Sequence, residues 1–478
     1  MESVRGFKLW ALFLSLNLSL KLQEPLTKVT GCVGSHAEMI RFLTFLLFSL
    51  TVLSHGEERP NIILIMADDL GIEGLSCYGS DSYQTPNLDK LAAQGMRFTH
   101  AFSQPLCTPT RVQIMTGKYN HRNWLYFGCL DPREKTFGHI FQEAGYKTCI
   151  SGKWQLTSYD PPEYPGSGQR RNTGMHPSKA GFDRWSLFHS EHTEDKGSRY
   201  ANPTVLENTG MRANTEGKYG EDIAVDVITD FLKENREDPF FLYYPMALPH
   251  WPFNPTPDSE DWTDPAKRLD EELKYFPDMV HYMDKVIGQI LKSVDDLGLA
   301  ENTMVIFFSD NGTDGKITSK MNGEDYLGGK NRTTQNGIHV PLIVRWPGKI
   351  AAKSICEDII DCSDFIPTMC EIAKIETKPE WKLDGRSFAP QLLGAEETNP
   401  RDSAFFWYDP TPGWDKDKFS RHIFAIDKQF KLYSDGRFYD YLEDPFEKKS
   451  LPFHALDERG IAAFSMLRST IEEMMEPR

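Results

Sequence analysis

The chain has 478 residues, of which 40% are hydrophobic and 12% aromatic, enough for a large core and unlike a disordered protein. Its length allows two or three domains, or one large domain with a smaller one. The formal net charge of −16 argues against a nucleic-acid-binding protein, because a phosphate-binding face needs clustered Lys and Arg. No internal repeat or low-complexity tract is visible, so the sequence favours a large, acidic globular protein.

The first 56 residues have the pattern of a presequence. Residues 8–20 and 42–53 are two apolar stretches, each behind a basic residue. The second has the length of a signal-peptide core, is too short to span a bilayer, and is followed by small residues that suit cleavage. We therefore expect translation to start at Met39 and the exported, mature chain to begin near Glu57, with no stable membrane span. The alternative is an N-terminal membrane anchor.

Downstream, strand-like and helix-like stretches alternate. Four continuous apolar runs have the length of buried strands and cover residues 61–67, 240–247, 303–309 and 340–346. Apolar residues recur at helical spacing within 224–232 and 280–294. This alternation predicts an α/β fold with a large central, mainly parallel sheet flanked by helices. In such sheets ligands bind beyond the carboxyl ends of the strands.

Acidic and amide side chains follow two of these runs. Asp68 and Asp69 close the first run, and Asp310 and Asn311 close the run 303–309. Adjacent carboxylates at the end of an apolar strand are costly unless a cation lies between them. Three carboxylates and an amide oxygen suit a hard divalent cation, Ca²⁺ or Mg²⁺, better than zinc. Taken alone, either pair also fits a turn or a helix cap.

Cys107 begins the pentapeptide Cys-Thr-Pro-Thr-Arg, which ends at Arg111. Pro109 suits the first turn of a helix, so we expect the cysteine just ahead of a helix N-terminus, where the dipole favours negative charge. Arg111, about one turn further on, can bind an anion at the same end. A thiol in such a place would be reactive. For the pentapeptide alone, a buried cysteine before an ordinary helix is an equal alternative.

Three further blocks supply cations and a proton donor. Lys153 follows the strand-like residues 146–150, His250 follows the run 240–247, and Lys330 follows a Gly-Gly pair. Alone, each lysine would be expected as a solvated surface charge, and the histidine as a hydrogen-bonded structural residue.

These motifs occur in sequence order between Pro60 and about Pro347. Their joint pattern resembles the formylglycine-dependent sulfatases of the alkaline-phosphatase-like superfamily. The resemblance implies a calcium-dependent sulfuric ester hydrolase whose substrate is a sulfated saccharide or another sulfate ester. It further implies that formylglycine-generating machinery oxidises Cys107 to an aldehyde during export, and that the hydrate of this aldehyde is the nucleophile. Thr110 replaces the serine usual in the family's pentapeptide, a mild departure.

The resemblance also implies the role of each matching residue. Calcium would be held by Asp68, Asp69, Asp310, Asn311 and the modified residue at position 107. Calcium and Asp310 would activate one hydroxyl of the hydrate for attack on sulfur. The cations that offset charge on the sulfuryl oxygens would be Arg111, Lys153 and Lys330. His250, with Lys330, would protonate the departing alcohol, and the covalent sulfate would then leave by C–O cleavage.

The chain departs from the family after Lys153. The family's Gly-Lys-Trp-His reads Gly-Lys-Trp-Gln here and ends at Gln155. In the family that histidine takes the proton whose removal expels sulfate, whereas an amide can hydrogen-bond to sulfate but cannot act as a base near neutral pH. Three alternatives follow. Another group acts as the base, with His189 and His192 as candidates, or turnover is slow, or the protein binds its ligand without hydrolysing it. The segment 330–337 also lacks the family's usual residues.

The chain changes character after residue 400. Short strand patterns and one helix pattern cover residues 403–408, 422–426, 430–433, 437–441 and 461–475. They resemble the small C-terminal subdomain of the sulfatases, an antiparallel sheet with a helix that helps wall the cleft.

We accordingly divide the chain into a presequence (1–56), a catalytic α/β domain (57–400) and the C-terminal subdomain (401–478). Substrate choice is expected in that subdomain and in the irregular loop 155–220, and Trp251 is a candidate sugar contact.

Two points stay open. Of eight cysteines, Cys32 lies in the presequence and Cys107 is the candidate nucleophile, so the other six could form three disulfides or remain thiols. Two other function classes also fit: a phosphodiesterase or phosphonate monoester hydrolase of the same superfamily, and a non-catalytic, calcium-dependent glycan-binding protein, which Gln155 suggests.

Overall fold

The structure is a computed structural model that describes residues 59–158, 166–191, 196–413 and 419–476. These residues form a unit distinct from residues 1–58, so the presequence prediction lies outside the described part. No helix within the described ranges is long and apolar enough to cross a bilayer.

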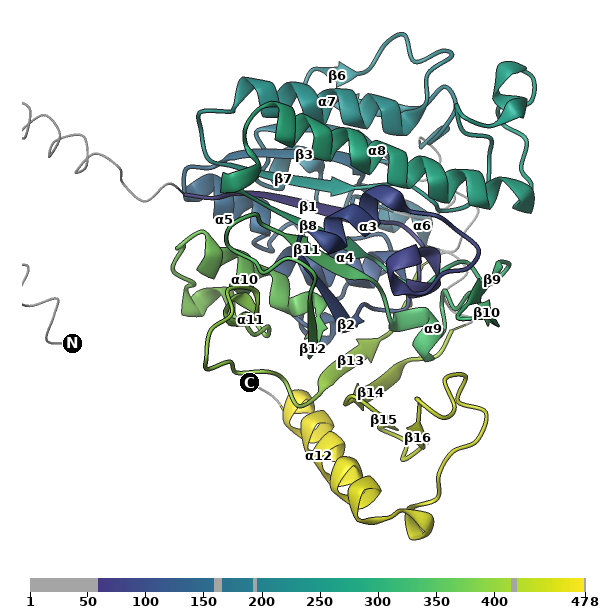
Figure 1. Cartoon of the computed structure of the whole chain (residues 1–478), viewed down its shortest axis with the longest axis vertical. Coiled ribbons are helices and arrows are strands. Elements are labelled where there is room, and N and C mark those ends of the chain that lie inside the picture. The colour runs from purple at the N-terminus through teal and green to yellow at the C-terminus, as the bar shows by residue number, and fades with distance from the viewer. Residues whose placement is uncertain (1–58, 159–165, 192–195, 414–418, 477–478) are drawn as a thin grey trace, which may run out of the picture. The chain divides into compact units, whose positions relative to one another are not determined.

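A ten-stranded sheet forms the centre of the unit (Figure 1). Its strands, in spatial order, are β12 (Ser354–Asp361), β2 (Met96–Phe102), β11 (Leu342–Arg345), β8 (Thr303–Ser309), β1 (Asn61–Ala67), β7 (Phe240–Pro245), β3 (Lys147–Lys153), β4 (Arg184–Phe188), β5 (Val205–Glu207) and β6 (Gly210–Met211). The five neighbouring strands β8, β1, β7, β3 and β4 are all parallel. The mainly parallel sheet predicted from the sequence is therefore confirmed.

Helices cover both faces of this sheet, as the unbroken apolar strands predict. Alternate residues of β1 point to opposite faces, so Ile62 and Leu64 enter one core and Ile63 and Ile65 the other. The first core is covered by α4 (Cys107–Thr116), α5 (Phe137–Glu143), α10 (Phe365–Ile372) and α11 (Ala389–Leu392). The second is covered by α3 (Pro86–Ala93), α7 (Gly220–Glu234) and α8 (Phe276–Asp296). Two short helices, α6 (Ser167–Arg170) and α9 (Gln335–Ile338), lie in connections.

Some details differ from the predicted elements. The run 340–346 forms a shorter strand, β11, which is antiparallel to both of its neighbours. The loop 155–220, expected to be irregular, contributes β4, β5 and β6 to the edge of the sheet. These strands are short and β6 is exposed, so their sequences carry little apolar periodicity.

The C-terminal part forms a second, antiparallel sheet with one helix (Figure 1). It consists of β13 (Ala404–Tyr408), β14 (His422–Ile426), β15 (Phe430–Tyr433), β16 (Phe438–Asp440) and α12 (Glu458–Met475). A small separate hairpin pairs β9 (Thr318–Met321) with β10 (Glu324–Leu327). Ala425 and Leu432 pack against Leu467 of α12. Phe406 and Phe424 instead pack with Phe102 of β2 and Ile359 of β12, at the edge of the ten-stranded sheet.

All seven cysteines of the described part are free thiols. Of the two alternatives that the sequence left open for the six cysteines besides Cys32 and Cys107, the structure has thiols and no disulfide among the residues described.

Candidate active site

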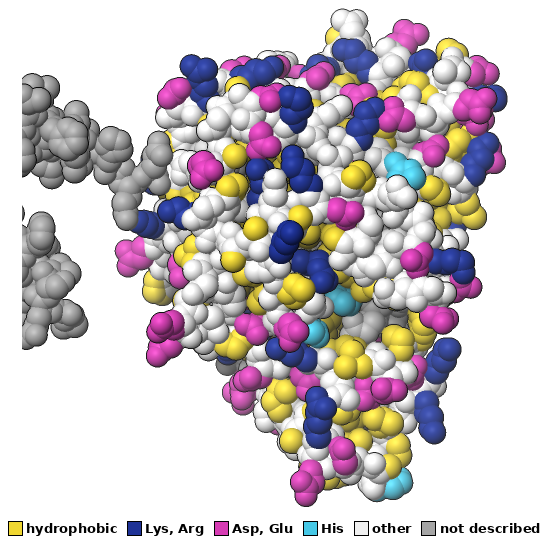
Figure 2. Space-filling view, in the orientation of Figure 1, with side chains coloured by type: hydrophobic (Ala, Val, Ile, Leu, Met, Phe, Trp, Pro, Cys, Tyr) yellow, Lys and Arg dark blue, Asp and Glu magenta, His cyan; other side chains and the backbone are white. Residues whose placement is uncertain are grey.

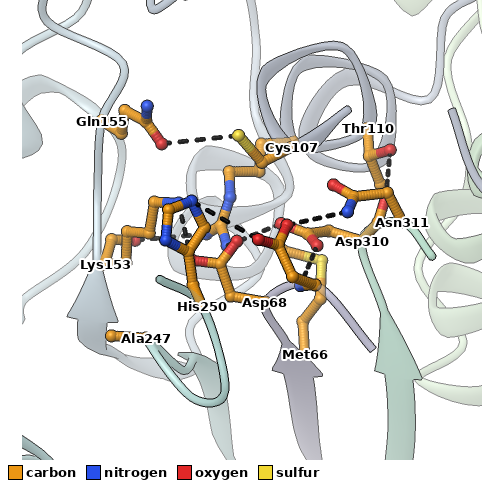
Figure 3. A network of polar contacts seen from close by, with 12 residues as sticks. Met66, Asp68, Cys107, Thr110, Lys153, Gln155, Ala247, His250, Asp310 and Asn311 are labelled. Atoms are coloured by element: carbon orange, nitrogen blue, oxygen red, sulfur yellow. Dashed lines mark hydrogen bonds and ion pairs between the residues drawn. The ribbon is translucent and has the colours of Figure 1, made fainter. Parts of the chain in front are cut away.

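Functional side chains converge at the carboxyl ends of the parallel strands, where the sequence placed them. Asp68 follows β1, Lys153 is the last residue of β3, His250 follows β7, and Asp310 follows β8. In Figure 3 these four side chains point toward one another from the ends of β1, β3 and β8 and from the loop after β7. The topology therefore brings together residues that lie up to 242 positions apart in the chain.

Cys107 is the first residue of α4, one position further into the helix than predicted. Leu106 is extended and ends the preceding segment, and Pro109 falls in the first helical turn, where its missing N–H is no loss. The Cys107 side chain is 2% exposed and packs with Phe127 and Tyr408. Burial raises the pKa of its thiol, so the thiolate is scarce at neutral pH.

Thr110, which replaces the family's usual serine, connects α4 to the end of β8. Its hydroxyl donates a hydrogen bond to the carbonyl of Asp310 at 2.6 Å and accepts one from the backbone N–H of Gln104 at 3.0 Å. The substitution thus keeps the hydroxyl and its hydrogen bonds, and it positions the first turn of the helix.

Three cations pair with three buried carboxylates. The Nζ of Lys153 lies 2.6 Å from Asp68. The Nζ of Lys330 lies 2.5 Å from Asp69. Nη2 of Arg111 lies 2.9 Å from Asp310 and 3.5 Å from Asp68.

These pairs set the protonation of the carboxylates. Burial alone would raise the pKa of Asp68, but Lys153 and other nearby cations hold that pKa well below its usual value. Burial and the neighbouring Asp68 instead raise the pKa of Asp310. Asp310 is thus the carboxylate that most needs an additional positive charge in order to remain ionised.

The oxygen atoms of this cluster fit a hard divalent cation. Asp68, Asp69, Asp310 and Asn311 are fully buried, and Oδ1 of Asn311 and Oδ1 of Asp68 accept no hydrogen bond in the structure. The amide nitrogen of Asn311 donates to Asp69 at 2.8 Å, which turns its oxygen away from that carboxylate (Figure 3). Buried oxygen acceptors without a donor are expensive unless a cation satisfies them. One oxygen each of Asp68 and Asp310 also lies within 4.8 Å of Sγ of Cys107.

His250 lies between two cations. Its Nε2 is 3.0 Å from Nζ of Lys330 and 3.6 Å from Asp69, and its Nδ1 is 2.7 Å from Nη1 of Arg199. Burial, and then the charge of Lys330, hold the pKa of His250 well below its usual value. The ring is therefore neutral near pH 7.

The backbone around His250 is fixed from two sides. The hydroxyl of Tyr200 donates to the carbonyls of Ala247 and His250, each at 2.6 Å. The Glu221 carboxyl accepts the N–H of Ala247 at 2.7 Å and the hydroxyl of Tyr244. These bonds position the imidazole, and no sequence pattern pointed to the residues that make them.

Gln155 approaches Cys107, as the sequence predicted. Its Oε1 lies 3.6 Å from Sγ of Cys107 (Figure 3). Its backbone has a left-handed φ of 59°, and its N–H donates to the carbonyl of His189 at 3.0 Å. The amide therefore points into the space where an anion bound at residue 107 would lie.

The other three residues predicted to contact the substrate differ in their placement. His189 is buried, and its backbone supports Gln155. His192 lies outside the described residues. Trp251 follows His250 and is 37% exposed, with its Nε1 donating to Glu271. The indole is thus partly exposed, and Nζ of Lys316 lies over its ring, 5.5 Å from the centroid.

Two functional candidates were missed by the sequence analysis. Arg199 contacts His250 from the segment before β5. Tyr408 of β13 packs against Cys107, and its buried hydroxyl has no hydrogen-bond partner among the described residues. Neither lies in a recognisable motif. Only the strand pattern 403–408 placed Tyr408 in an element, without indicating its orientation.

Comparison with known protein families identifies the family to which this arrangement of residues belongs. The family model described as Sulfatase matches residues 60–375, which include every residue of the cluster. A second model, N-sulphoglucosamine sulphohydrolase, C-terminal, matches residues 323–474.

The chain belongs to the sulfatase family.

As a sulfatase it is a sulfuric ester hydrolase, and it has named relatives along most of its length. It is 32% identical to arylsulfatase A of Homo sapiens over 371 residues, which is 73% of this chain and 70% of that one. It is 30% identical to N-acetylgalactosamine-6-sulfatase of Canis lupus familiaris over 385 residues, 73% of this chain and 69% of the relative.

Solved structures share the fold of this sulfatase. One was determined in complex with its substrate D-glucosamine-2-N,6-O-disulfate. It superposes with a TM-score of 0.68 at 23% identity, covering 88% of this chain and 99% of the other. The likeness confirms the alkaline-phosphatase-like architecture implied by the sequence motifs.

Proposed function

We propose that this sulfatase is an exported, calcium-dependent enzyme that removes a sulfate ester from a sulfated carbohydrate by means of a formylglycine made from Cys107. The observation that carries the proposal is the position of Cys107. It is buried at the first turn of α4, close to the cations Arg111 and Lys153 and to the carboxylates of Asp68 and Asp310.

Modification of Cys107 is supported by the state of the thiol itself. Because burial raises its pKa, the unmodified side chain would be a poor nucleophile at neutral pH. A formylglycine at this position supplies the hydroxyl of a hydrated aldehyde as the attacking group. The oxygen of Gln155, 3.6 Å from Sγ, is placed to hold that group or the bound sulfate by a hydrogen bond.

Calcium would be held by Asp68, Asp69, Asp310 and Asn311. The unpartnered oxygens of Asn311 and Asp68 support this assignment. The all-oxygen set favours Ca²⁺ or Mg²⁺ over softer metals, and calcium is the ion implied by the family resemblance. When bound, the cation supplies Lewis-acid polarisation of oxygens at residue 107 and of the sulfate.

Arg111 and Lys153 would bind the scissile sulfate. Both side chains are buried, and both lie close enough to Cys107 to interact with it electrostatically. Their positive charges stabilise the negative charge that accumulates on the sulfuryl oxygens as the ester bond breaks. The guanidinium can do this with two parallel hydrogen bonds.

His250 and Lys330 would deliver the proton to the leaving alcohol. Burial alone would lower the pKa of Lys330, but Asp69 and its acidic neighbours raise it above its usual value, so this amine keeps its proton. The neutral His250 ring accepts from it at 3.0 Å. We assign the proton store to Lys330 and the transfer path to His250.

A carbohydrate substrate is supported by two features. Trp251 follows His250 in the chain and is partly exposed, so the part of its indole that Lys316 does not cover could contact a sugar. The relatives include an N-acetylgalactosamine-6-sulfatase and a protein crystallised with a disulfated glucosamine as its substrate. A sulfated hexosamine is therefore the first substrate class to test.

The test compares a sulfate ester with its phosphate analogue. Purified exported protein should release sulfate from the ester much faster than phosphate from the analogue, and Cys107→Ala should lose that activity while retaining its fold. Cys77→Ala, which removes another thiol from the same chain, should keep it. Faster phosphate release would favour the phosphodiesterase alternative, and binding of the sulfated sugar without any release would favour the glycan-binding alternative.

A further inference from the structure

Arg199 is a half-buried cation at the site that the family motifs do not include. Its Nη1 lies 2.7 Å from Nδ1 of His250, and its guanidinium lies over the rings of Phe188 and Tyr200, at 5.1 Å and 6.0 Å from their centroids. No carboxylate of the described ranges forms an ion pair with it. Because Nε2 of the neutral ring accepts from Lys330, Nδ1 carries the ring proton and faces the carbonyl of Trp251, so Arg199 approaches Nδ1 without donating a hydrogen bond to it. The guanidinium donates no hydrogen bond to another described residue, so its five N–H groups remain available.

The charges of the catalytic cluster balance without Arg199. Arg111, Lys153 and Lys330 each pair with one buried carboxylate, and a divalent cation would add enough positive charge for the scissile sulfate. Arg199 comes in addition to this balance. Lys196 lies close enough to Arg199 and Lys153 for their charges, after burial, to lower its pKa to about 8. Arg199 therefore adds positive charge on one side of the site.

This extra charge lies on the leaving-group side. Lys330 approaches the Nε2 atom of His250 and Arg199 approaches the Nδ1 atom, so the imidazole separates Arg199 from the carboxylate that Lys330 binds. A sulfate bound at Cys107 would contact Arg111 and Lys153. The alcohol that receives a proton from His250 would extend toward Arg199.

We propose that Arg199 binds a second anionic group of the substrate, a carboxylate or another sulfate on the sugar that leaves. This inference rests on the proposed function and narrows its substrate to sugars with at least two anionic groups. The aromatic contacts fix the plane of the guanidinium, so its unused N–H groups are arranged to fork onto an oxyanion. The competing explanation is that Arg199 only orients His250.

A matched pair of aryl sulfates separates the two explanations. The compounds are 4-nitrophenyl sulfate and 2-carboxy-4-nitrophenyl sulfate, which differ by one carboxylate next to the scissile group. For each variant, kcat/KM on the second compound is divided by kcat/KM on the first, so that effects on His250 cancel. We expect Arg199→Gln to lower this ratio about tenfold, mainly through KM, as the loss of one charged hydrogen-bonded contact predicts.

Two further variants complete the experiment. Arg199→Lys keeps the charge and should retain most of the ratio. Arg212→Gln removes a half-buried arginine that pairs with Glu207 on the neighbouring hairpin, and should leave the ratio unchanged. Equal losses on both compounds in Arg199→Gln would show that Arg199 only positions His250 and would overturn the proposal.

The outcome also distinguishes this inference from the proposed function. If the wild type releases no sulfate from either compound, the proposed catalytic function is wrong. Calorimetric titration of both compounds into the wild type and the same variants then still tests the inference. The inference predicts that the wild type binds the carboxylated compound more tightly, and that Arg199→Gln loses this difference in affinity. Equal affinity for the two compounds in the wild type would refute it.

Discussion

Gln155 is the residue whose chemistry differs most from the resemblance that identified the site. Its left-handed φ is one that histidine also tolerates, so the exchange requires no change of backbone. The amide hydrogen-bonds toward residue 107 but cannot remove a proton near neutral pH. Since every other cluster residue is retained, we infer that another group supplies the base.

Gln155→His should therefore change kcat by less than tenfold, about 1.4 kcal/mol of barrier, because a second base adds little where one already acts. His189→Ala should reduce kcat by more, since His189 is buried next to Gln155. Steady-state sulfate release measures both effects. Intact-protein mass spectrometry after substrate addition provides the check. Sulfate retained on most molecules of the wild type, together with faster turnover of Gln155→His, would mean that no base has replaced the histidine.

Asn311 reports on the metal site because its side-chain oxygen accepts no hydrogen bond from any described residue. Calcium bound only by the folded state should stabilise it by about 3 kcal/mol at a hundredfold excess over Kd. Chelator should therefore lower the Tm of the wild type, and Asn311→Ala should largely remove this response. Differential scanning calorimetry with calcium and with chelator measures it.

Asn254→Ala is the matched control, since it removes another buried asparagine, one that donates to the carbonyl of Asp270. It should lower the Tm but keep the full response to calcium. A wild type whose Tm and activity ignore chelator would contradict the metal assignment.

At the scale of elements, the connection after β7 carries His250, and α7 holds this connection through Glu221. Burial raises the pKa of Glu221 from 4.5 to about 7. The folded protein thus binds this proton more tightly than the unfolded chain. The resulting stabilisation is complete below about pH 4.5 and is lost as the pH rises through about 7.

Glu221→Gln should remove this dependence, which is on the order of 3 kcal/mol. As the pH rises from about 5 to about 8, the wild type should lose stability relative to the variant, so the free energy of unfolding of Glu221→Gln should increase relative to that of the wild type. Chemical denaturation across this range measures the difference. Glu234→Gln, an exposed change near the end of the same helix, should run parallel to the wild type at every pH. A Glu221→Gln curve that is also parallel would show that the carboxyl is ionised throughout.

The elements that the sequence predicted well are those whose burial is uniform. The runs 61–67 and 303–309 became β1 and β8 with the same bounds, because a central strand covered on both faces must be apolar throughout. The four C-terminal strands were also located to within two residues. By contrast, β4 to β6 form a partly exposed edge and have no such pattern.

The same distinction applies to the site. Residues at strand ends or in motifs, such as Asp68 and Cys107, could be assigned from the sequence. Arg199 and Glu221 could not, because they act through tertiary contacts with the connection after β7. Their positions depend on how distant segments pack, and this information is not contained in local residue patterns.

For the molecule as a whole, charge is distributed rather than concentrated. On the face shown in Figure 2, basic and acidic side chains are interspersed, and the chain as a whole is acidic. The cations Arg111, Lys153 and Lys330 lie instead in the site, paired with its buried carboxylates. We therefore expect attraction for an anion to be local to the site.

Export should leave a mature N-terminus between Ser54 and Glu57, because a short apolar stretch followed by small residues is a substrate for signal peptidase. N-terminal sequencing of protein recovered outside the cytoplasm measures this. An intact residue 1, or a retained 42–53 segment that keeps the protein in the membrane fraction, would contradict the proposed export.

The most direct test of the proposed mechanism is the mass of the tryptic peptide that contains residue 107, taken from exported, active protein. We predict that the CH₂–SH group of Cys107 is replaced by an aldehyde, and that the modified fraction rises in proportion to the rate of sulfate release across preparations. Fully active protein whose peptide carries only an unmodified thiol would contradict the account.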